Sequence, residues 1–409
     1  MKLNIFDEEL IRNPYPIYAQ LHIEGSIHLG VAPIPEFPPC WYVINFQEAI
    51  KILRNPAFVH DRSKVNLAQP LSGFSGNALQ FWQQIVEWPL FLDAPEHTDK
   101  RRLVASFFRE NAIADLEQYT TDIANQLLDN LIALKSFDAM WDFSYPLTLA
   151  VICKILGCTP PDVKWFKTHT TALANALDFK TNSDYTPALA AVSALNEYIS
   201  QQISLQKQAK GNNLFNHLIN DGQFKEDDKA LISLFLQVLF AGQETAADGI
   251  GNGLIALQEN PQALKTISED LLNINNLVSE VLRFDNPLQF SGIRTATLDY
   301  AVGDKIIKRG ESVVIAFGAC CHDPQRFTDP QKLDVERDLN GSDIVFGHGI
   351  HYCLGVHLAK LETRIAFEVL LKRLPKNWKI SYIEKRKNII FKGPRFLTIQ
   401  LNSNDVSIK

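Results

Sequence analysis

Apolar positions along most of this chain repeat at helical spacing. From about residue 97 to residue 275 they recur every three or four positions, which predicts a succession of α-helices. Clusters of Gly, Pro, Asn and Asp divide this region at 157–162, 180–187, 210–213 and 220–227. Its longest nearly uncharged run, Ala230 to Gly242, is shorter than the roughly 20 residues that a membrane span requires and predicts a buried helix.

Short alternating stretches add a small amount of β-structure. Residues 41–58 predict a strand followed by a helix with apolar residues at Ala49, Ile50 and Leu53. Residues 300–317 and 387–401 alternate in the manner of small hairpins. We find no internal repeat, low-complexity tract or long linker, so the pattern predicts one domain over residues 1–409 that is mainly α with small β-sheets.

Composition narrows the class of protein. Hydrophobic residues make up 46% of the chain and charged residues 21%, which is typical of a globular protein. The net charge of −6 argues against bulk attraction to nucleic acid or to an anionic membrane. The N-terminus carries acidic residues where a signal peptide or anchor needs an apolar core, and the six cysteines include no CxxC pair. We therefore expect a cytoplasmic protein with reduced thiols and no membrane anchor.

Candidate chemistry is concentrated in "FGHGIHYCLG", residues 346–355. The following segment has apolar residues at helical spacing, so the Cys353 sulfur is expected at a helix N-terminus, where amides and the helix dipole favour a thiolate. The glycines leave space beside this sulfur for a broad, flat group. Two other interpretations of Cys353 remain open at this point: a small buried cysteine, or a zinc site built from His348, His351, Cys353 and the nearby His357.

The longer stretch "FGHGIHYCLGVHLAKLE" resembles the haem-binding signature of the cytochrome P450 family. The resemblance implies that Cys353 is the thiolate ligand of the iron in haem b, a ligand that pushes electron density towards O–O cleavage. It also implies the P450 fold, with the haem between a long central helix and the cysteine loop. The other loop residues in register with this signature are Phe346, Gly347, Gly349, His351, Gly355 and Ala359.

Distant segments resemble the same family in the same order. "SEVLRF" contains Glu280 and Arg283, an i,i+3 pair that resembles the ExxR element, which would join Arg337 in the haem-side core. "LFAGQETAADG" resembles the oxygen-activating segment of the central helix, and this likeness places Ala241 and Gly242 against the haem and Glu244 and Thr245 in catalysis. By the same resemblance, the haem propionates would meet His97, Arg101, Arg294 and His351.

The chain departs from the family pattern at a few positions. Gln243 precedes the acid, the residues Cys320, Cys321 and His322 stand where small residues, Asn and Arg are usual, and Leu333 replaces a common Phe. These departures concern the packing before the cysteine loop.

The resemblance implies a soluble, bacterial-type haem-thiolate monooxygenase, and we expect a monomer. Electrons would come indirectly from NAD(P)H through a ferredoxin or flavodoxin and its reductase. Thr245 is expected to hold a water molecule that Glu244 links to solvent, so that protons reach bound oxygen. A basic patch of Lys100, Arg102, Arg109, Lys360 and Arg364 would receive the acidic electron donor, although solvated helix faces explain these residues almost equally well.

The expected substrate pocket is apolar and aromatic, which indicates a medium-sized lipophilic small molecule. Its predicted lining is Phe74, Val238, Leu288, Gln289, Phe290, Ser291 and Phe391. The alternatives are a haem-thiolate peroxygenase, a P450-type coupling or isomerising enzyme, and a non-catalytic haem-binding protein. An intact acid and alcohol pair argues against the peroxide route, and a carrier would not need that pair.

Overall fold

The structure is a computed structural model that describes residues 3–34, 37–67, 74–178, 184–208, 211, 213–220, 228–339 and 343–401. Its α-helices are α1 Glu8–Arg12, α2 Tyr15–Glu24, α3 Phe46–Arg54, α4 Gly76–Ile85, α5 Glu96–Ala105, α6 Glu110–Ala114, α7 Glu117–Leu131, α8 Tyr145–Leu156, α9 Val163–Leu177, α10 Thr186–Gln208, α11 Leu214–Asn220, α12 Asp228–Glu259, α13 Pro261–Glu269, α14 Ile274–Phe284, α15 Phe317–Cys320 and α16 Val356–Arg373. Strands are fewer and short. They are β1 Ile27–Gly30, β2 Cys40–Val43, β3 Phe58–Val59, β4 Ser136–Asp138, β5 Arg294–Ala296, β6 Tyr300–Val302, β7 Lys305–Ile307, β8 Ser312–Ile315, β9 Lys379–Lys385 and β10 Pro394–Gln400.

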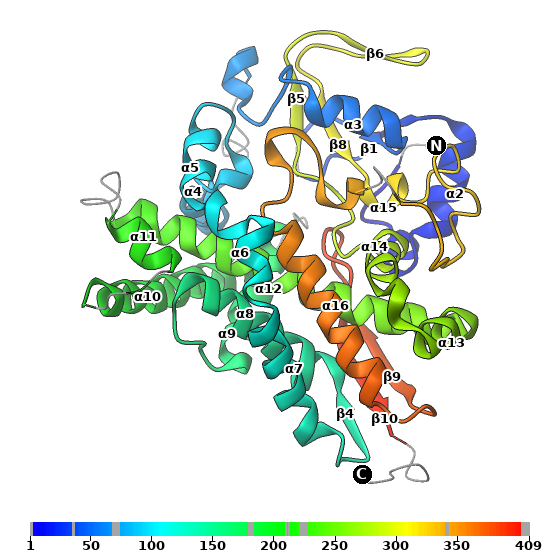
Figure 1. Cartoon of the computed structure of the whole chain (residues 1–409). Coiled ribbons are helices and arrows are strands. Elements are labelled where there is room, and N and C mark those ends of the chain that lie inside the picture. Colours follow the sequence, from blue (N-terminus) through cyan, green and yellow to red (C-terminus); the bar gives the residue numbers. More distant parts are fainter. Residues whose placement is uncertain are drawn as a thin grey trace.

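The strands form three small sheets beside a large helical body (Figure 1). The five-stranded sheet has the order β1-β2-β8-β5-β3, in which only β2 and β8 run parallel. A three-stranded sheet, β4-β10-β9, lies at the end of the helical body, and β6 with β7 forms a hairpin. The predicted class, mainly α with small β-sheets, is confirmed.

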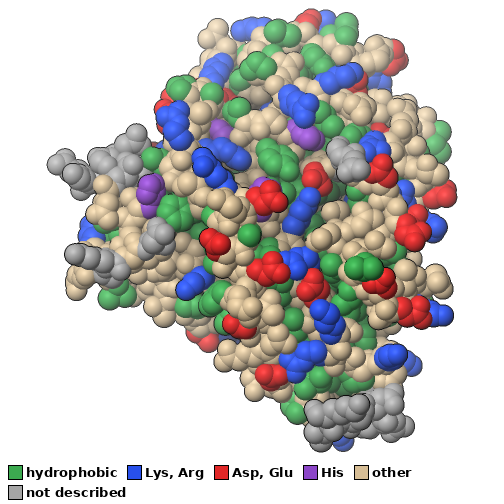
Figure 2. Space-filling view, viewed as in Figure 1, with side chains coloured by type: hydrophobic (Ala, Val, Ile, Leu, Met, Phe, Trp, Pro, Cys, Tyr) green, Lys and Arg blue, Asp and Glu red, His purple; other side chains and the backbone are tan. Residues whose placement is uncertain are grey.

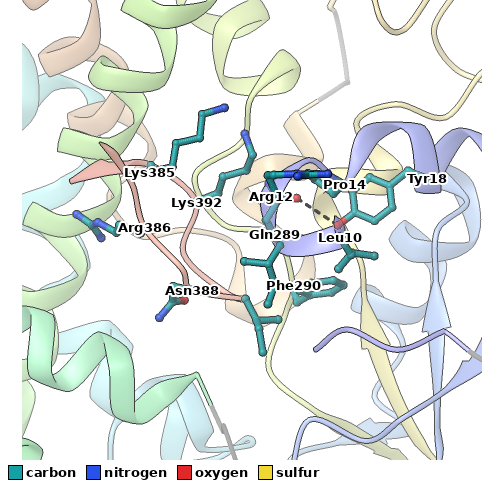
Figure 3. A pocket seen from close by; sticks show the side chains of 13 residues that line it. Leu10, Arg12, Pro14, Tyr18, Gln289, Phe290, Lys385, Arg386, Asn388 and Lys392 are labelled. Atoms are coloured by element: carbon teal, nitrogen blue, oxygen red, sulfur yellow. Dashed lines mark hydrogen bonds between the residues drawn. The ribbon is translucent and has the colours of Figure 1, made fainter. Parts of the chain in front are cut away.

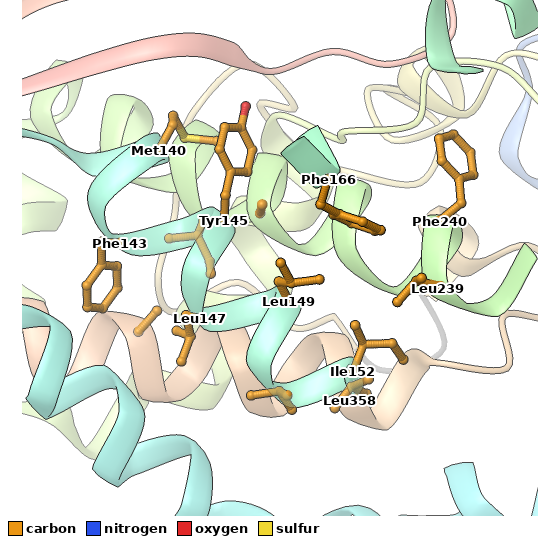
Figure 4. Close-up of a cluster of buried hydrophobic side chains, with 14 of the residues drawn as sticks. Met140, Phe143, Tyr145, Leu147, Leu149, Ile152, Phe166, Leu239, Phe240 and Leu358 are labelled. Atoms are coloured by element: carbon orange, nitrogen blue, oxygen red, sulfur yellow. The ribbon is translucent and has the colours of Figure 1, made fainter. Parts of the chain in front are cut away.

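Helix α12 runs through the middle of the helical body, and α8 and α16 pack against it (Figure 1). Its 32 residues include a long series of fully buried apolar side chains, as the run from Ala230 predicted. Apolar side chains of α8, α9, α12 and α16 interlock in one cluster, which includes Ile152, Phe166, Leu239 and Leu358 (Figure 4). Among the described residues, two helical segments are apolar and long enough to span a membrane, Ala139–Leu156 and Asp228–Glu259, and each lies mostly inside this core.

Two local predictions differ from the structure. The segment 136–138, inside the region predicted as helical, is strand β4, because it pairs with the C-terminal strand β10 through Phe137 and Ile399. The predicted hairpin over 387–401 is shifted: its strands are β9 and β10, and residues 386–393 connect them. The first difference comes from pairing with a strand distant in sequence, which a local alternation pattern does not contain. The second is a displacement of the first strand of the hairpin towards the N-terminus.

The unusual residues before the cysteine loop are accommodated in the core. Cys320 and Cys321 are fully buried, and His322 is 2% exposed, with Nδ1 3.0 Å from the Gly318 carbonyl oxygen. Leu333 is also buried. These departures from the family pattern are therefore accommodated as buried side chains.

Candidate functional site

The cysteine loop turns sharply just before α16. Gly347 and Gly349 have positive φ angles of 70° and 74°, a left-handed conformation that glycine adopts without strain. A Cβ atom on Gly349 would lie 2.4 Å from the carbonyl oxygen of Leu53, so this position also needs glycine for close packing against α3. The backbone N–H of Cys353 donates to the Phe346 carbonyl at 2.8 Å, which closes the loop.

The Cys353 thiol is half-buried and lies three residues before the first residue of α16. Burial raises the pKa of this thiol, while the backbone N–H of Gly355 and the charge of Arg101 act to lower it. The Gly355 N–H acts in the direction that the sequence predicted for amides at a helix N-terminus, and Arg101 adds to it, but burial outweighs both groups for a free thiol. A bound metal ion would reverse this balance, because a coordinating thiol is deprotonated. A Cβ atom on Gly355 would meet no atom within 4 Å, so the loop has room on this side.

Nitrogen-rich side chains gather beside the loop. The ring centroids of His97 and His351 are 4.2 Å apart, and Arg101 and Arg294 act on His351 electrostatically. His97 Nδ1, His351 Nε2 and Arg294 Nε are buried and have no hydrogen-bond partner among the described residues. Buried polar atoms are normally paired. Two carboxylates, such as haem propionates, would satisfy these atoms, so the residues present fit the haem that the sequence implied.

His60 belongs to the same cluster and was not predicted. Its ring contacts that of His351 edge to face, with centroids 4.9 Å apart. Burial and the nearby charge of Arg294 lower the His60 pKa to about 4. The nearest acid, Asp93, already accepts hydrogen bonds from the backbone N–H groups of His60 and Asp61. His60 lies in no recognisable motif, and only the fold brings it here.

The structure brings Glu280, Arg283 and Arg337 together in the core. Arg283 binds Glu280 with two hydrogen bonds, Nε to Oε2 at 2.7 Å and Nη2 to Oε1 at 2.8 Å. Arg337 Nε donates to Glu280 Oε1 at 3.1 Å. Arg283 and Arg337 both also donate to the Lys332 carbonyl oxygen. This ionic triad joins α14 to the segment that leads into the cysteine loop.

One face of α12 is open in the middle of a buried helix. Ala241 is exposed and Thr245 is half-buried, whereas Gln243 and Ala247 on other faces are buried. The Thr245 hydroxyl donates to the Ala241 carbonyl at 3.2 Å. Gly242, expected to lie against the haem, has its Cα hydrogens towards α8, because a Cβ atom there would lie 2.7 Å from Ile152 Cδ1. The small residues of α12 thus serve both an open face and close helix packing.

Glu244 points away from this open face into a buried group of charges. Its Oε2 accepts a 2.5 Å hydrogen bond from Lys167 Nζ of α9, and its Oε1 accepts one from Arg386 in the β9–β10 connection. Burial would raise the Glu244 pKa, but the charges of Arg386 and Lys167 outweigh burial and lower it to about 2. Glu244 is therefore an ionised carboxylate, held one residue away from Thr245 but on a different side of the helix.

The predicted pocket residues divide into two groups. Phe74, Val238, Leu288 and Phe391 all join the large apolar cluster around α12, where Phe391 meets Phe240 edge to face at 5.9 Å. Gln289 and Phe290 instead line a cleft bordered by α1, α2 and residues 385–393 (Figure 3). Gln289 Oε1 accepts from the Tyr18 hydroxyl at 3.2 Å, and Phe290 packs on Tyr42.

The remaining predicted residues have structural contacts. The Ser291 hydroxyl accepts from the Ile315 N–H and donates to the Gly292 carbonyl, so it ties a loop to β8. Phe346 lies under Lys360, whose Nζ is 5.5 Å from the ring centroid. The Ala359 N–H donates to the Gly355 carbonyl at 2.8 Å and begins α16.

The zinc interpretation receives no support from this geometry. Among the described residues, no three His, Cys, Asp or Glu side chains converge as a metal site would require. The arrangement is instead a single thiol and a polar cluster suited to carboxylates, with a helix of small residues nearby. These features fit the haem-binding class of protein that the sequence resembles.

Comparison with known proteins agrees with this class. The model of the family described as Cytochrome P450 matches residues 173–402. The chain is 30% identical to cytochrome P450 monooxygenase PikC of Streptomyces venezuelae, over 92% of this chain and 87% of that protein. It is 31% identical to cytochrome P450 CYP107DY1 of Priestia megaterium, over 82% of this chain and 83% of that protein. This chain belongs to the cytochrome P450 family and is an enzyme of the monooxygenase class.

Solved structures show the same fold. P450BioI, in complex with acyl carrier protein ligated to hexadec-9Z-enoic acid, superposes with a TM-score of 0.87 at 26% identity and covers 97% of this chain and 99% of its own. The tirandamycin C-bound monooxygenase TamI superposes with a TM-score of 0.83 at 29% identity, with coverage of 97% and 99%. The family implies a haem cofactor, and the fit of the residues around Cys353 agrees with it.

Proposed function

We propose that this enzyme inserts one oxygen atom from O2 into a lipophilic small molecule, with electrons delivered by a ferredoxin or flavodoxin and its reductase from NAD(P)H. The observation that supports this best is the open face of α12, where Thr245 and Ala241 are accessible in the middle of an otherwise buried helix. A catalytic alcohol on such a face has access to a bound substrate. A carrier or sensor would not need it.

The residues suited to hold the cofactor surround the cysteine loop. Cys353 would supply the thiolate that holds the haem iron, and His97, Arg101, Arg294 and His351 would bind the propionates, with His60 beside them. When bound there, haem b supplies the oxygen activation and C–H oxidation chemistry. The protein positions the substrate and controls the supply of protons.

Thr245 is proposed to hold the proton-delivering water. Its hydroxyl donates to the Ala241 carbonyl of the same helix, so its oxygen lone pairs remain able to accept from water on the open face. Glu244 is proposed to connect this water to solvent. Because Lys167 and Arg386 hold both Glu244 oxygens, this role requires the carboxylate to leave at least one of them.

The substrate is proposed to be a medium-sized apolar molecule bound near Val238, Leu288 and Phe391. These side chains join Phe240 and Phe74 in an apolar and partly aromatic environment, which favours hydrocarbon over polar ligands. Of the two structural neighbours, P450BioI is bound to acyl carrier protein ligated to hexadec-9Z-enoic acid, which has a long hydrocarbon chain, and TamI is bound to tirandamycin C. A substrate attached to an acyl carrier protein is a second form of the same proposal, supported by the P450BioI complex.

The proposed electron-donor surface is the face that carries α16. Four of the five predicted cations have polar partners: Lys100 bonds the Glu87 carbonyl, Arg102 pairs with Asp99, Lys360 with Asp343, and Arg364 with Glu117 and Glu368. Figure 2 accordingly shows positive and negative side chains interspersed over α7 and α16. We expect moderate dependence of association on ionic strength. We also propose a cytoplasmic monomer.

Oxygen labelling tests the proposed reaction. A compound library is first screened for a spin-state shift of the purified protein, in free form and loaded on acyl carrier protein. The best compound is then incubated with NAD(P)H, ferredoxin and reductase under labelled O2. One labelled oxygen atom in the product supports the monooxygenase. Turnover with H2O2 alone, at equal or higher rate, would support the peroxygenase instead.

A further inference from the structure

Two carboxyl groups on α12 share one arginine. Glu244 and Asp248 are one helical turn apart and fully buried. Arg386 donates through Nη1 to Glu244, and its Nη2 lies 2.9 Å from Asp248 Oδ1. The proposed function uses Glu244 and leaves Asp248, a buried acid beside it, without a role.

Asp248 interacts with its neighbours through charge rather than through hydrogen bonds. Within the described part of the chain neither of its oxygens has a well-aligned hydrogen-bond donor, and the Arg386 Nη2–H donates to the Tyr145 hydroxyl at 3.0 Å. Figure 4 shows this hydroxyl directed out of the apolar cluster. A Cβ atom on Gly393 would lie 2.4 Å from Asp248 Oδ1, so glycine lets the backbone before β10 pack against the carboxyl group.

The groups that face Asp248 form a balanced set. Arg386 comes from the β9–β10 connection, Lys167 from α9, Glu244 from α12 and Tyr145 from α8. With both acids ionised, two cations and two anions cancel inside the core. Lys167 Nζ also lies 4.3 Å from the centroid of the Tyr145 ring.

Release of Glu244 is the difficult step in this arrangement. If Glu244 turned towards Thr245 without Asp248 present, Arg386 would remain as a buried cation without a counter-charge. Breaking a buried ion pair in this way is strongly unfavourable, because it leaves an uncompensated charge in the core. An ionised Asp248 reduces that cost, because Arg386 keeps an anionic partner while Glu244 moves.

We propose that Asp248 is a positioning residue that competes with Glu244 for Arg386 and thereby allows Glu244 to turn towards Thr245. The inference rests on the proposed role of Glu244 in proton supply. Burial raises the Asp248 pKa to about 7, so the ionised fraction changes near neutral pH. Arg386 borders the cleft in Figure 3 and its side chain is 11% exposed, which gives this group of charges a contact with solvent.

Asp248→Asn tests the competition in the haem-loaded enzyme. The substrate is the library compound with the largest spin-state shift, and the readout is product formed per NAD(P)H consumed. In the natural protein this coupling should fall several-fold as the pH drops through about 7, because protonated Asp248 releases Arg386 to Glu244. In the Asp248→Asn variant, the product formed per NAD(P)H consumed should be low and should not change with pH over the same range. Coupling and pH dependence like those of the natural protein would overturn the inference.

Asp285→Asn is the matched control. Asp285 is also a buried aspartate whose carboxylate pairs with a cation of the same connection, Lys392, yet it has no contact with Glu244. This variant should keep the pH dependence of coupling. Loss of that dependence in both variants would assign the effect to the connection as a whole and overturn the role of Asp248.

A stability titration gives a readout that needs no turnover. Because the Asp248 pKa is raised in the folded state from 3.8 to about 7, folded protein binds more protons than unfolded protein between these values. This group therefore lowers stability as pH rises through that window, and Asp248→Asn should remove that decrease. An unchanged slope would contradict the titration of Asp248.

A second variant, Arg386→Lys, tests the inference if Asp248→Asn folds poorly. Arg386→Lys keeps the charge but not the fork that reaches both acids, so it should also abolish the pH dependence of coupling. Retained dependence would overturn the inference. Failure of the proposed function would be seen separately, as absent coupled turnover in the natural protein, and would overturn both.

Discussion

The imidazole of His351 lies between two other histidine rings, those of His60 and His97. Burial and the neighbouring charged groups lower the His351 pKa to about 2, so the His351 imidazole is neutral beside the arginines. At the residue scale, the site is thus defined by buried side-chain nitrogens that have no hydrogen-bond partner among the described residues. A pair of carboxylates would supply the missing acceptors.

We predict that His60→Ala weakens haem retention. The variant removes an edge-to-face ring contact of a kind worth about 0.5–1.5 kcal/mol and frees His351 to rotate. The rate of haem transfer to apomyoglobin should rise about two- to tenfold. His169→Ala, which removes a comparable contact with Trp165 in α9, should leave this rate unchanged. Equal rates for the natural protein and His60→Ala would contradict the assignment.

Gly349 gives a second prediction at this scale. Gly349→Ala combines backbone strain at φ 74° with the overlap on the Leu53 carbonyl oxygen, and it should destabilise the protein by about 3 kcal/mol. Gly303→Ala is the control, because Gly303 has φ 60° and no atom lies near its absent Cβ. It should lose only the strain, about 1–2 kcal/mol. Chemical denaturation measures the free energy of unfolding of both variants. Equal decreases would show that the backbone shifts near Leu53 and relieves the overlap, which would contradict the prediction.

At the scale of elements, the ionic triad of Glu280, Arg283 and Arg337 joins α14 to the segment before the cysteine loop. All three side chains are at most 9% exposed. Arg283 also donates to the carbonyl oxygens of Cys321 and Pro330, so one side chain fixes several turns of irregular backbone. The position of the thiol therefore depends on an ion pair remote from it.

We predict that Glu280→Gln destabilises the protein by about 3–5 kcal/mol, because it leaves two buried guanidinium groups without a counter-charge. Thermal unfolding monitored by circular dichroism measures this loss. Glu48→Gln, which breaks the exposed pair with Lys51, should change the stability by less than about 1 kcal/mol. If Glu280→Gln lost as little stability as Glu48→Gln, water would have to solvate the two guanidinium groups in place of the carboxylate, and the prediction would be wrong.

The sequence was sufficient for those elements whose pattern is local. The apolar run from Ala230 predicted α12, and the glycines around Cys353 predicted the cysteine loop. Both predictions were possible because helix periodicity and turn preferences depend on residues that are neighbours in sequence. The pairing of β4 with β10 could not be predicted, since it joins residues distant in sequence. The partners of Glu244 were missed for the same reason: Lys167 and Arg386 approach it from two other elements.

At the scale of the whole molecule, the helical body and the sheet-bearing part meet at the candidate site. The sheet side contributes Arg294 from β5 and the loop with His60 after β3, while the helical body contributes α5, α12 and α16. Figure 1 shows α12 and α16 crossing in the centre, with the five-stranded sheet to one side. No single element carries the site, so haem binding should couple the two parts in folding.

The most direct test is the carbon monoxide difference spectrum of the reduced protein, with and without the thiol. The account predicts a strongly red-shifted Soret band for the natural protein and its loss in Cys353→Ala, at comparable folded content by circular dichroism. A natural protein that stays colourless after haem supplementation, or a Cys353→Ala variant that keeps the red-shifted band, would contradict it.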